Sequence, residues 1–365
     1  MIDTTLTHTS VTGPNSAVNK TQEEKLFANA ILSKKMPTYR QAYSDRTAWL
    51  MSCVAELAYV KFNPLVHNEK LETMFNKRLD EYFDTKKKDL LTALLRSLSY
   101  NAKDQEKVLT SDLDTIHLKL IYTFDVKDTQ AFIAVTDHFS VLSFRGTEAT
   151  RPKDIKSGLK AVQVKCVSGG MVHSGFSEAF DVVSEQVQTA LNSTDIAAKP
   201  LFITGHSLGG ALATIAAKRL THKSGIAACY TFGSPRVGDT DWVAGLRTPV
   251  YRIVNAVDAV TMMPLGGEII EFISKLLSIF PFLQPTSVWV QKKVGGYLHS
   301  GDMRYLTNCQ SGDFEKVKLL SSVSWMYRIM GLVKNSFSAS KVLKDHLMVN
   351  YRTKLGIIAR KRNLD

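Results

Sequence analysis

The sequence predicts an α/β fold in which helices flank a mostly parallel central sheet, preceded by an N-terminal helical extension. Three short apolar runs between residues 118 and 144 are rich in β-branched and aromatic residues, which is typical of strands. After residue 174, strand and helix patterns alternate, and this predicts parallel strands with helices on both faces of the sheet. The chain has 365 residues, of which 44% are hydrophobic and 22% charged, so it is long enough to bury the core of such a domain.

The N-terminal part of the chain has a helical pattern. Residues 1–22 are polar, and we expect them to be disordered. Residues 23–105 are expected to form a helical extension packed on the main domain, and residues 106–365 to form one α/β domain. The extension is predicted from apolar side chains at helical spacing: Trp49, Cys53 and Leu57; Leu71, Phe75 and Leu79; and Leu90, Leu91, Leu94, Leu95 and Leu98.

The elements of the α/β domain follow from local patterns. Turns that contain aspartate separate the first three strands, which we expect at 118–124, 131–135 and 139–144. A helix near 174–194 comes next. Beyond it we expect a strand at 200–204, a helix at 207–220, and strands at 226–232 and 250–255.

The net charge of +12 favours an anionic partner. No basic run is interleaved with aromatic residues, so we expect no nucleic-acid groove; the alternatives are peripheral contact with an anionic membrane and a surface that is merely rich in lysine. The N-terminus lacks the apolar segment of a secretory signal, and glycines interrupt the uncharged stretch 200–217. We therefore expect no transmembrane segment, and a cytoplasmic location or export by a route that needs no signal peptide.

Metal and cofactor sites are not expected from the sequence. The four cysteines have no C-x-x-C spacing and are predicted to be reduced thiols. There is no H-E-x-x-H motif, carboxylate cluster or glycine-rich phosphate loop. The chemistry of the chain is thus expected to come from its own side chains.

The run Gly205-His206-Ser207-Leu208-Gly209 fits the pattern G-x-S-x-G. In this motif a strand turns sharply into a helix, and the serine hydroxyl is exposed at the turn, while the glycines remove Cβ atoms that would collide. An apolar run, Leu201-Phe202-Ile203-Thr204, precedes the motif, and an alanine-rich helix former follows it. The flanks favour a nucleophilic Ser207 over an ordinary glycine-rich turn.

A serine nucleophile needs a histidine base and an acid that orients the base. Asp258 is the preferred acid, because it follows the apolar run 250–254 at the edge where catalytic groups of α/β sheets collect; Asp239 is the competitor. The acid precedes the histidine in proteins with this motif. Of the nine histidines, that order leaves His299 and His346.

Five blocks in this order resemble the class 3 lipase family, which has the α/β-hydrolase fold: Phe144-Arg145-Gly146-Thr147, Val172-His173-Ser174-Gly175-Phe176, the Ser207 motif, Thr231-Phe232-Gly233-Ser234-Pro235-Arg236-Val237-Gly238, and Asn255-Ala256-Val257-Asp258. The resemblance covers about residues 118 to 350. It implies that Thr147 and the backbone N–H of Leu208 stabilise an oxyanion. It also favours His346 as the catalytic base, with His299 as the alternative.

Two further segments concern the substrate. The resemblance implies a lid at 148–171, although Ile155 stands where a tryptophan is usual, which weakens the expectation of strong interfacial activation. In the segment 269–280, apolar side chains lie on one helical face. This segment is expected either to pack in the core, or to border an acyl pocket or dip into lipid.

The expected function is hydrolysis of fatty-acyl esters of lipids, by a phospholipase or a glyceride lipase, through an acyl-enzyme on Ser207. The positive charge slightly favours phospholipid. The alternative is a catalytically silent lipase-like scaffold that binds lipid or a protein partner.

Overall fold

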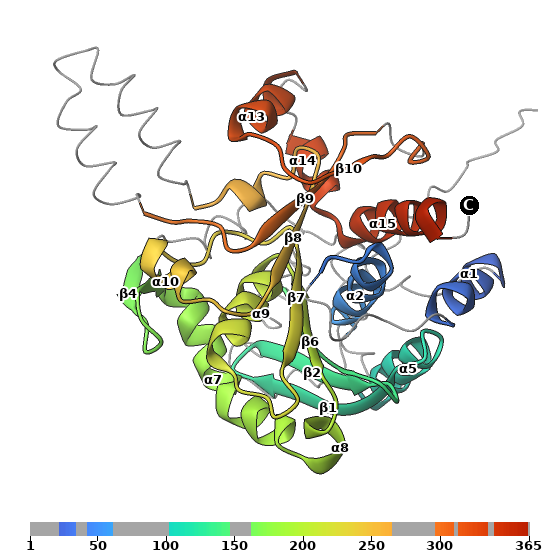
Figure 1. The fold of residues 1–365 in the computed structure, drawn as a ribbon, viewed down its shortest axis with the longest axis vertical. Helices are drawn as coiled ribbons and strands as arrows, with labels where there is room; N and C mark the ends of the chain where they lie inside the picture. Colours follow the sequence, from blue (N-terminus) through green and yellow to red (C-terminus); the bar gives the residue numbers. More distant parts are fainter. Residues whose placement is uncertain are drawn as a thin grey trace, which may run out of the picture.

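An eight-stranded sheet with the order β1-β2-β3-β6-β7-β8-β9-β10 organises the molecule (Figure 1). The computed structural model describes residues 22–33, 42–60, 102–146, 162–264, 296–309, 313–334 and 339–363. Strands β3 to β9 of this sheet run parallel to their neighbours, whereas β1, β2 and β10 pair antiparallel. The predicted α/β fold with a mostly parallel sheet is therefore confirmed.

The strands of this sheet are β1 (Lys119–Val126), β2 (Thr129–Val135), β3 (Ser140–Phe144), β6 (Leu201–His206), β7 (Ile226–Phe232), β8 (Val250–Asn255), β9 (Asp302–Leu306) and β10 (Leu319–Leu320). A separate hairpin consists of β4 (Gln163–Lys165) and β5 (Met171–His173). Each strand predicted from the sequence is present, with bounds that differ by at most two residues. The parallel strands could be predicted because they are continuous apolar runs, and they are apolar because both of their faces are buried.

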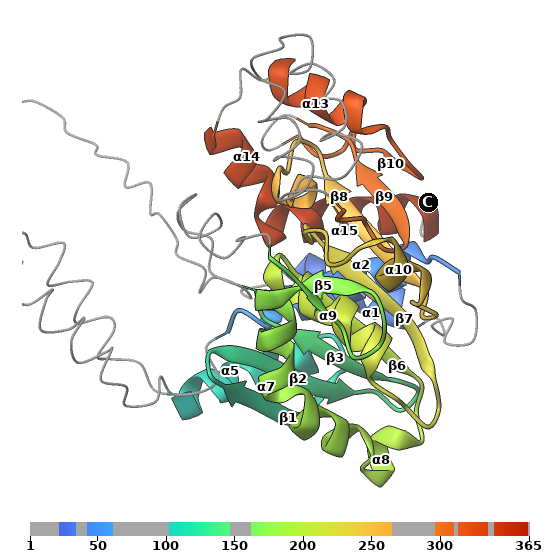
Figure 2. The same cartoon turned by 90° about the vertical axis from the view of Figure 1, so that its left-hand side faces the viewer.

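Helices cover both faces of the sheet (Figures 1 and 2). On one face, α7 (Ser174–Leu191) and α9 (Leu208–Arg219) pack against strand residues such as Leu142 and Ile203. On the other face, α2 (Asp45–Leu57) and α15 (Met348–Asn363) pack against the alternate residues of the same strands, such as Val141 and Phe202. The period of two along each strand therefore divides the apolar core into two clusters.

The remaining helices are α1 (Gln22–Leu32), α5 (Ala102–Asp114), α8 (Thr194–Ala197), α10 (Thr240–Ala244), the 3-10 turn η1 (Val260–Met262), α13 (Trp325–Lys334) and α14 (Ala339–His346). None of the described helices is both long enough and apolar enough to cross a membrane.

The N-terminal helix α2 lies directly on the sheet. Ser44 caps its first turn by accepting a hydrogen bond from the N–H of Thr47. The hydroxyl of Ser143 in β3 donates to a carbonyl oxygen of α2, and the hydroxyl of Thr204 in β6 is shared between a carbonyl oxygen of α2, at 3.2 Å, and that of Tyr230 in β7, at 2.9 Å. Helical spacing around Trp49 predicted this helix. The division at residue 105 stays a prediction, and the apolar stripes at 71–79 and 90–98, like residues 1–21, lie outside the described residues.

Candidate active site

Ser207 lies in the turn between β6 and α9. Since β6 ends at His206 and α9 begins at Leu208, the serine occupies the sharp strand-to-helix turn that its motif predicts. Its backbone has φ 55° and ψ −126°, a conformation that costs a residue with a side chain about 1–3 kcal/mol. A Cβ atom at Gly209 would collide with the carbonyl oxygen of Phe144 in β3, so only glycine fits there.

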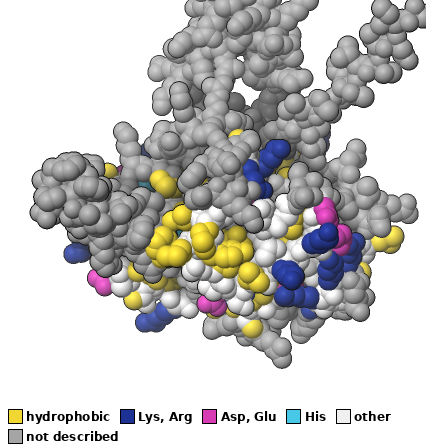
Figure 3. Space-filling view, turned by 90° about the horizontal axis from the view of Figure 1, so that it is seen from above, with side chains coloured by type: hydrophobic (Ala, Val, Ile, Leu, Met, Phe, Trp, Pro, Cys, Tyr) yellow, Lys and Arg dark blue, Asp and Glu magenta, His cyan; other side chains and the backbone are white. Residues whose placement is uncertain are grey.

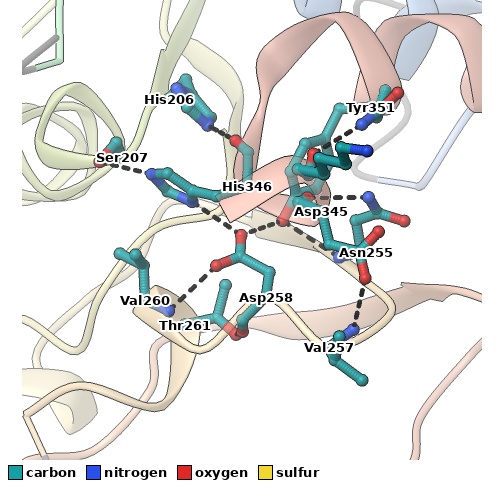
Figure 4. A network of polar contacts seen from close by, with 12 residues as sticks. His206, Ser207, Asn255, Val257, Asp258, Val260, Thr261, Asp345, His346 and Tyr351 are labelled. Carbon is teal, nitrogen blue, oxygen red and sulfur yellow. Dashed lines mark hydrogen bonds and ion pairs between the residues drawn. The ribbon is translucent and has the colours of Figure 1, made fainter. Parts of the chain in front are cut away.

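Three side chains from distant segments form one chain of hydrogen bonds (Figure 4). The hydroxyl oxygen of Ser207 lies 2.9 Å from Nε2 of His346. On the other side of the ring, Nδ1 lies 2.9 Å from Oδ2 of Asp258. An ionised carboxylate only accepts, so Nδ1 carries the proton, and Nε2 accepts from the serine hydroxyl. All three side chains are buried.

The fold brings Asp258 and His346 to the same edge of the sheet. Asp258 follows the C-terminal end of β8, and His346 is the last residue of α14. Gly233, just after β7, lies against both with φ 58°. A Cβ atom there would come within 2.8 Å of the Asp258 carboxylate and 3.0 Å of Nδ1 of His346. The glycine thus leaves room for the acid–base pair.

The Asp258 carboxylate has two further partners. The hydroxyl of Tyr351 in α15 donates to Oδ2 at 2.6 Å, and the N–H of Val260 donates to Oδ1 at 3.0 Å. Burial alone would raise the pKa of Asp258, but the charge of His346 and the hydrogen bonds from His346 and Tyr351 outweigh it and lower the pKa below its ordinary value. Asp258 is therefore held as a carboxylate.

His206 supports the backbone of His346. Burial is the main cause that lowers the pKa of His206, to about 3, so the ring is neutral. Its Nε2 donates to the carbonyl oxygen of His346 at 2.7 Å, and its Nδ1 accepts from the hydroxyl of Tyr59 at 2.7 Å. Tyr59 lies just after α2, so the N-terminal helix is linked to the segment that carries the base.

Sequence reasoning did not identify Tyr59 or Tyr351. Each is a single tyrosine outside any motif, and each reaches the site from a segment far away in the chain, 147 residues from His206 and 93 residues from Asp258. No local spacing or composition in the sequence distinguishes them from core tyrosines such as Tyr230.

The two alternatives for base and acid lie apart from the serine. Nε2 of His299 donates to the carbonyl oxygen of Thr261 at 2.7 Å. Burial, followed by the charges of neighbouring arginines, lowers the pKa of His299 well below its usual value. Asp239 caps α10, because its carboxylate accepts from the N–H of Trp242. The structure brings neither of them into hydrogen-bond contact with Ser207.

Of the two expected oxyanion donors, only Leu208 belongs to the described residues. As the first residue of α9 it has no acceptor for its N–H within the helix, and a helix N-terminus favours negative charge. Thr147 lies outside the described residues, as do 148–161 of the expected lid and the segment 269–280. The end of the lid segment, from 162 to 171, carries β4 and the start of β5.

The arrangement is suited to nucleophilic chemistry. A serine hydroxyl that can pass its proton to a histidine, itself oriented by a carboxylate, can attack a carbonyl carbon. In the described part of the chain, no three His, Cys, Asp or Glu side chains come together as metal ligands would. The sheet with a serine at a strand-to-helix turn is the α/β-hydrolase fold.

Comparison with known proteins shows what the chain is similar to. Residues 141–267 match the model of the family described as Lipase (class 3). The chain is 40% identical to secreted mono- and diacylglycerol lipase 1 of Fusarium solani over 27% of its own length and 31% of that protein. It is 32% identical to a lipase of Rhizomucor miehei, over 46% of this chain and 52% of that one.

A third relative is the chloroplastic phospholipase A(1) DAD1 of Arabidopsis thaliana, with 34% identity over 35% of this chain and 31% of that protein. The chain thus spans about a third to a half of the length of these curated relatives. The match of residues 141–267 to the class 3 lipase model confirms the resemblance that the motifs predicted.

Proposed function

We propose that the chain hydrolyses the carboxylic ester bonds of lipids through an acyl-enzyme intermediate. The observation that carries the proposal is the continuous hydrogen-bond chain from Ser207 through His346 to Asp258, at the N-terminus of α9. The match of residues 141–267 to class 3 lipases, and relatives named lipase and phospholipase, support the same activity.

Each group has a role in this mechanism. Ser207 attacks the ester carbonyl while His346 takes its proton, and His346 then donates that proton to the leaving alcohol. Asp258 holds the imidazole in the required tautomer and stabilises the imidazolium. The N–H of Leu208, with Thr147, stabilises the tetrahedral oxyanion, at about 3 kcal/mol for each donor. A water molecule then cleaves the acyl-enzyme by the same sequence of proton transfers.

Exposed apolar side chains near the base support a lipid substrate. Leu347, directly after His346, is 45% exposed, and Val349 is 43% exposed. On α13, Met326 and Met330 are more than half exposed. In Figure 3, hydrophobic side chains gather on the face seen from above, with lysine and arginine side chains beside them. We infer that this face makes peripheral contact with a lipid surface.

Within that class we favour anionic phospholipid over neutral glyceride. The support is the net charge of +12, which attracts anionic head groups at a surface. A cytoplasmic location, or export without a signal peptide, stays a prediction, as does the absence of a nucleic-acid partner.

The test measures fatty-acid release from anionic phospholipid vesicles and from a triglyceride emulsion, by wild type and by Ser207→Ala. We expect release that the substitution abolishes, and faster release from the vesicles. A circular dichroism spectrum and Tm equal to those of wild type would show that Ser207→Ala is folded. No release from either substrate by folded wild type would instead favour a silent lipid-binding scaffold.

A further inference from the structure

Lys354 in α15 is a buried lysine that the mechanism above does not use. Its side chain is 1% exposed. Its Nζ donates to Oδ1 of Asn255 at 2.6 Å and to the carbonyl oxygen of Thr307 at 3.0 Å, and the ring of Phe314 lies 5.5 Å away. Burial lowers the pKa of Lys354, and a buried ammonium group is unfavourable unless it is hydrogen-bonded. Its shortest hydrogen bond goes to a residue of the segment that carries the catalytic acid.

The bond from Lys354 fixes the orientation of the Asn255 side chain. An ammonium group only donates, so the amide oxygen of Asn255 faces Lys354 and the amide nitrogen points the other way. That nitrogen, Nδ2, donates to the carbonyl oxygen of Asp345 at 2.8 Å (Figure 4). Asn255 is fully buried, so water does not compete for either bond. Lys354 thus determines which end of the amide meets Asp345.

Asp345 lies at the end of the helix that carries the base. The last carbonyl groups of a helix have no partner within it, and α14 ends at His346. The carbonyl oxygen of Asp345 accepts from Asn255, the last residue of β8. The carbonyl oxygen of His346 accepts from His206, the last residue of β6, at 2.7 Å. Two strand ends therefore hold the helix end that presents the base.

A second hydrogen bond joins the same two segments in the opposite direction. The backbone N–H of Val257 donates to Oδ2 of Asp345 at 3.3 Å. Lys341, one turn earlier in α14, lies 3.6 Å from the same oxygen. Val257 directly precedes Asp258, and Asp345 directly precedes His346. The residues before the acid and before the base are therefore linked, once through the side chain of Asn255 and once through that of Asp345.

We propose that Lys354, Asn255 and Asp345 are positioning residues that set the separation of Asp258 and His346. They act through the backbone beside the acid and the base, whose side chains lie 2.9 Å apart, and not on the ester itself. A small displacement of a catalytic group lowers the rate steeply, because the reacting atoms must be aligned. The inference rests on the proposed function, since the separation of acid and base matters for that chemistry.

The test compares Asn255→Leu, Lys354→Met and the double variant on a soluble short-chain ester. In Asn255→Leu we expect kcat to fall between about tenfold and about 100-fold, with KM unchanged, because the side chain does not contact substrate. Lys354→Met should lower kcat about tenfold. Because Lys354 acts through Asn255, the double variant should be as slow as Asn255→Leu alone. Its Tm should nevertheless be higher than that of Asn255→Leu, since it removes the ammonium left without its amide partner.

Two control variants separate positioning from stability. Lys361→Met makes the same change at an exposed lysine two turns further along α15 and should keep the wild-type kcat. Val187→Ala, buried in α7, should lower the Tm and leave kcat unchanged. If Asn255→Leu does not fold, Asn255→Asp keeps the acceptor for Lys354 and loses only the donor to Asp345. An unchanged kcat in the folded variants, or a kcat that recovers together with Tm in the double variant, would overturn the proposal.

A second readout does not depend on ester hydrolysis. Proton NMR observes the proton on Nδ1 of His346, which is hydrogen-bonded to Asp258, and the loss of its low-field signal in His346→Ala assigns it. This signal should shift or disappear in Asn255→Leu and stay unchanged in Lys361→Met. An unchanged signal in Asn255→Leu would also overturn the proposal. A wild type that hydrolyses no ester, but whose signal responds to Asn255→Leu, would contradict the proposed function alone.

Discussion

Two sets of buried polar side chains lie on either side of Asp258, one with the serine and one with arginines, and they differ in whether each hydrogen-bond donor has an acceptor. On the side of the serine, His346 and Tyr351 both contact the carboxylate, and His346 also contacts Ser207. On the other side, Arg328 contacts the same loop, while Arg252 has unsatisfied donors among the described residues. A polar network is stable when each member is paired and costly when one is not. On the serine side each of these groups is paired, whereas on the arginine side two buried donors of Arg252 have no acceptor among the described residues.

The substitution with the largest expected effect changes Asp258, the carboxylate at the centre of the hydrogen bonds on the serine side. In Asp258→Asn the amide cannot hold His346 in the tautomer that accepts from the serine, so the rate should fall about 10⁴-fold. The measurement is kcat/KM on a soluble short-chain ester. The matched control, Asp241→Asn on an exposed turn of α10, should keep the wild-type rate. A fall of less than tenfold in Asp258→Asn would show that the acid lies elsewhere.

A second comparison uses two buried tyrosines. Tyr351→Phe removes a hydrogen bond to the Asp258 carboxylate and the acceptor of the Asn255 N–H, and it should lower the free energy of unfolding by about 2 kcal/mol. Tyr297→Phe removes a hydroxyl that is buried with no partner among the described residues, so it should cost nothing or stabilise. Denaturant unfolding at pH 7 measures both. Equal losses in the two variants would contradict the assigned role of Tyr351.

The same pair of variants predicts a pH dependence. The pKa of Asp258 is lowered in the folded state, so the carboxylate contributes stability above its unfolded pKa, and that contribution is lost as the pH falls through the folded pKa. Loss of the Tyr351 hydrogen bond raises the folded pKa towards its usual value. The stability difference between wild type and Tyr351→Phe should therefore shrink in acid, whereas the difference for Tyr297→Phe should not change in this way.

The smallest expected effect concerns the link from α2. Tyr59→Phe removes the hydroxyl that donates to Nδ1 of His206, and His206 in turn donates to the carbonyl oxygen of His346. A net loss of about 1 kcal/mol corresponds to a fall in rate of less than about tenfold. Tyr122→Phe on the exposed face of β1 is the control and should have no effect. A fall as large as that of Asp258→Asn would place Tyr59 in the chemistry itself.

The central sheet and Ser207 were predictable from local sequence. The parallel strands are apolar runs because both of their faces are buried, and the glycines around Ser207 mark a turn where Cβ atoms do not fit. Asp258 was predictable because it follows a strand at the edge where such groups collect. These features depend on short segments of the chain.

The rest depends on contacts between distant segments. The order of residues in the sequence left His299 and His346 as the two candidates for the base. Of these two, only His346 contacts Ser207 in the structure. Three buried arginines near η1 come from separate segments of the chain, Arg236, Arg252 and Arg328, and the position of Met303 opposite Arg252 follows from strand register. No local pattern encodes such a meeting of side chains.

The proposed mechanism depends most directly on the reactivity of Ser207. The decisive measurement is labelling of the folded chain with a fluorophosphonate, followed by mapping of the modified residue by mass spectrometry. We expect one adduct, on Ser207, and its loss in His346→Ala, because His346 is the base that activates the hydroxyl in the proposed mechanism. Absence of an adduct on folded wild type, or an adduct on another residue, would contradict it.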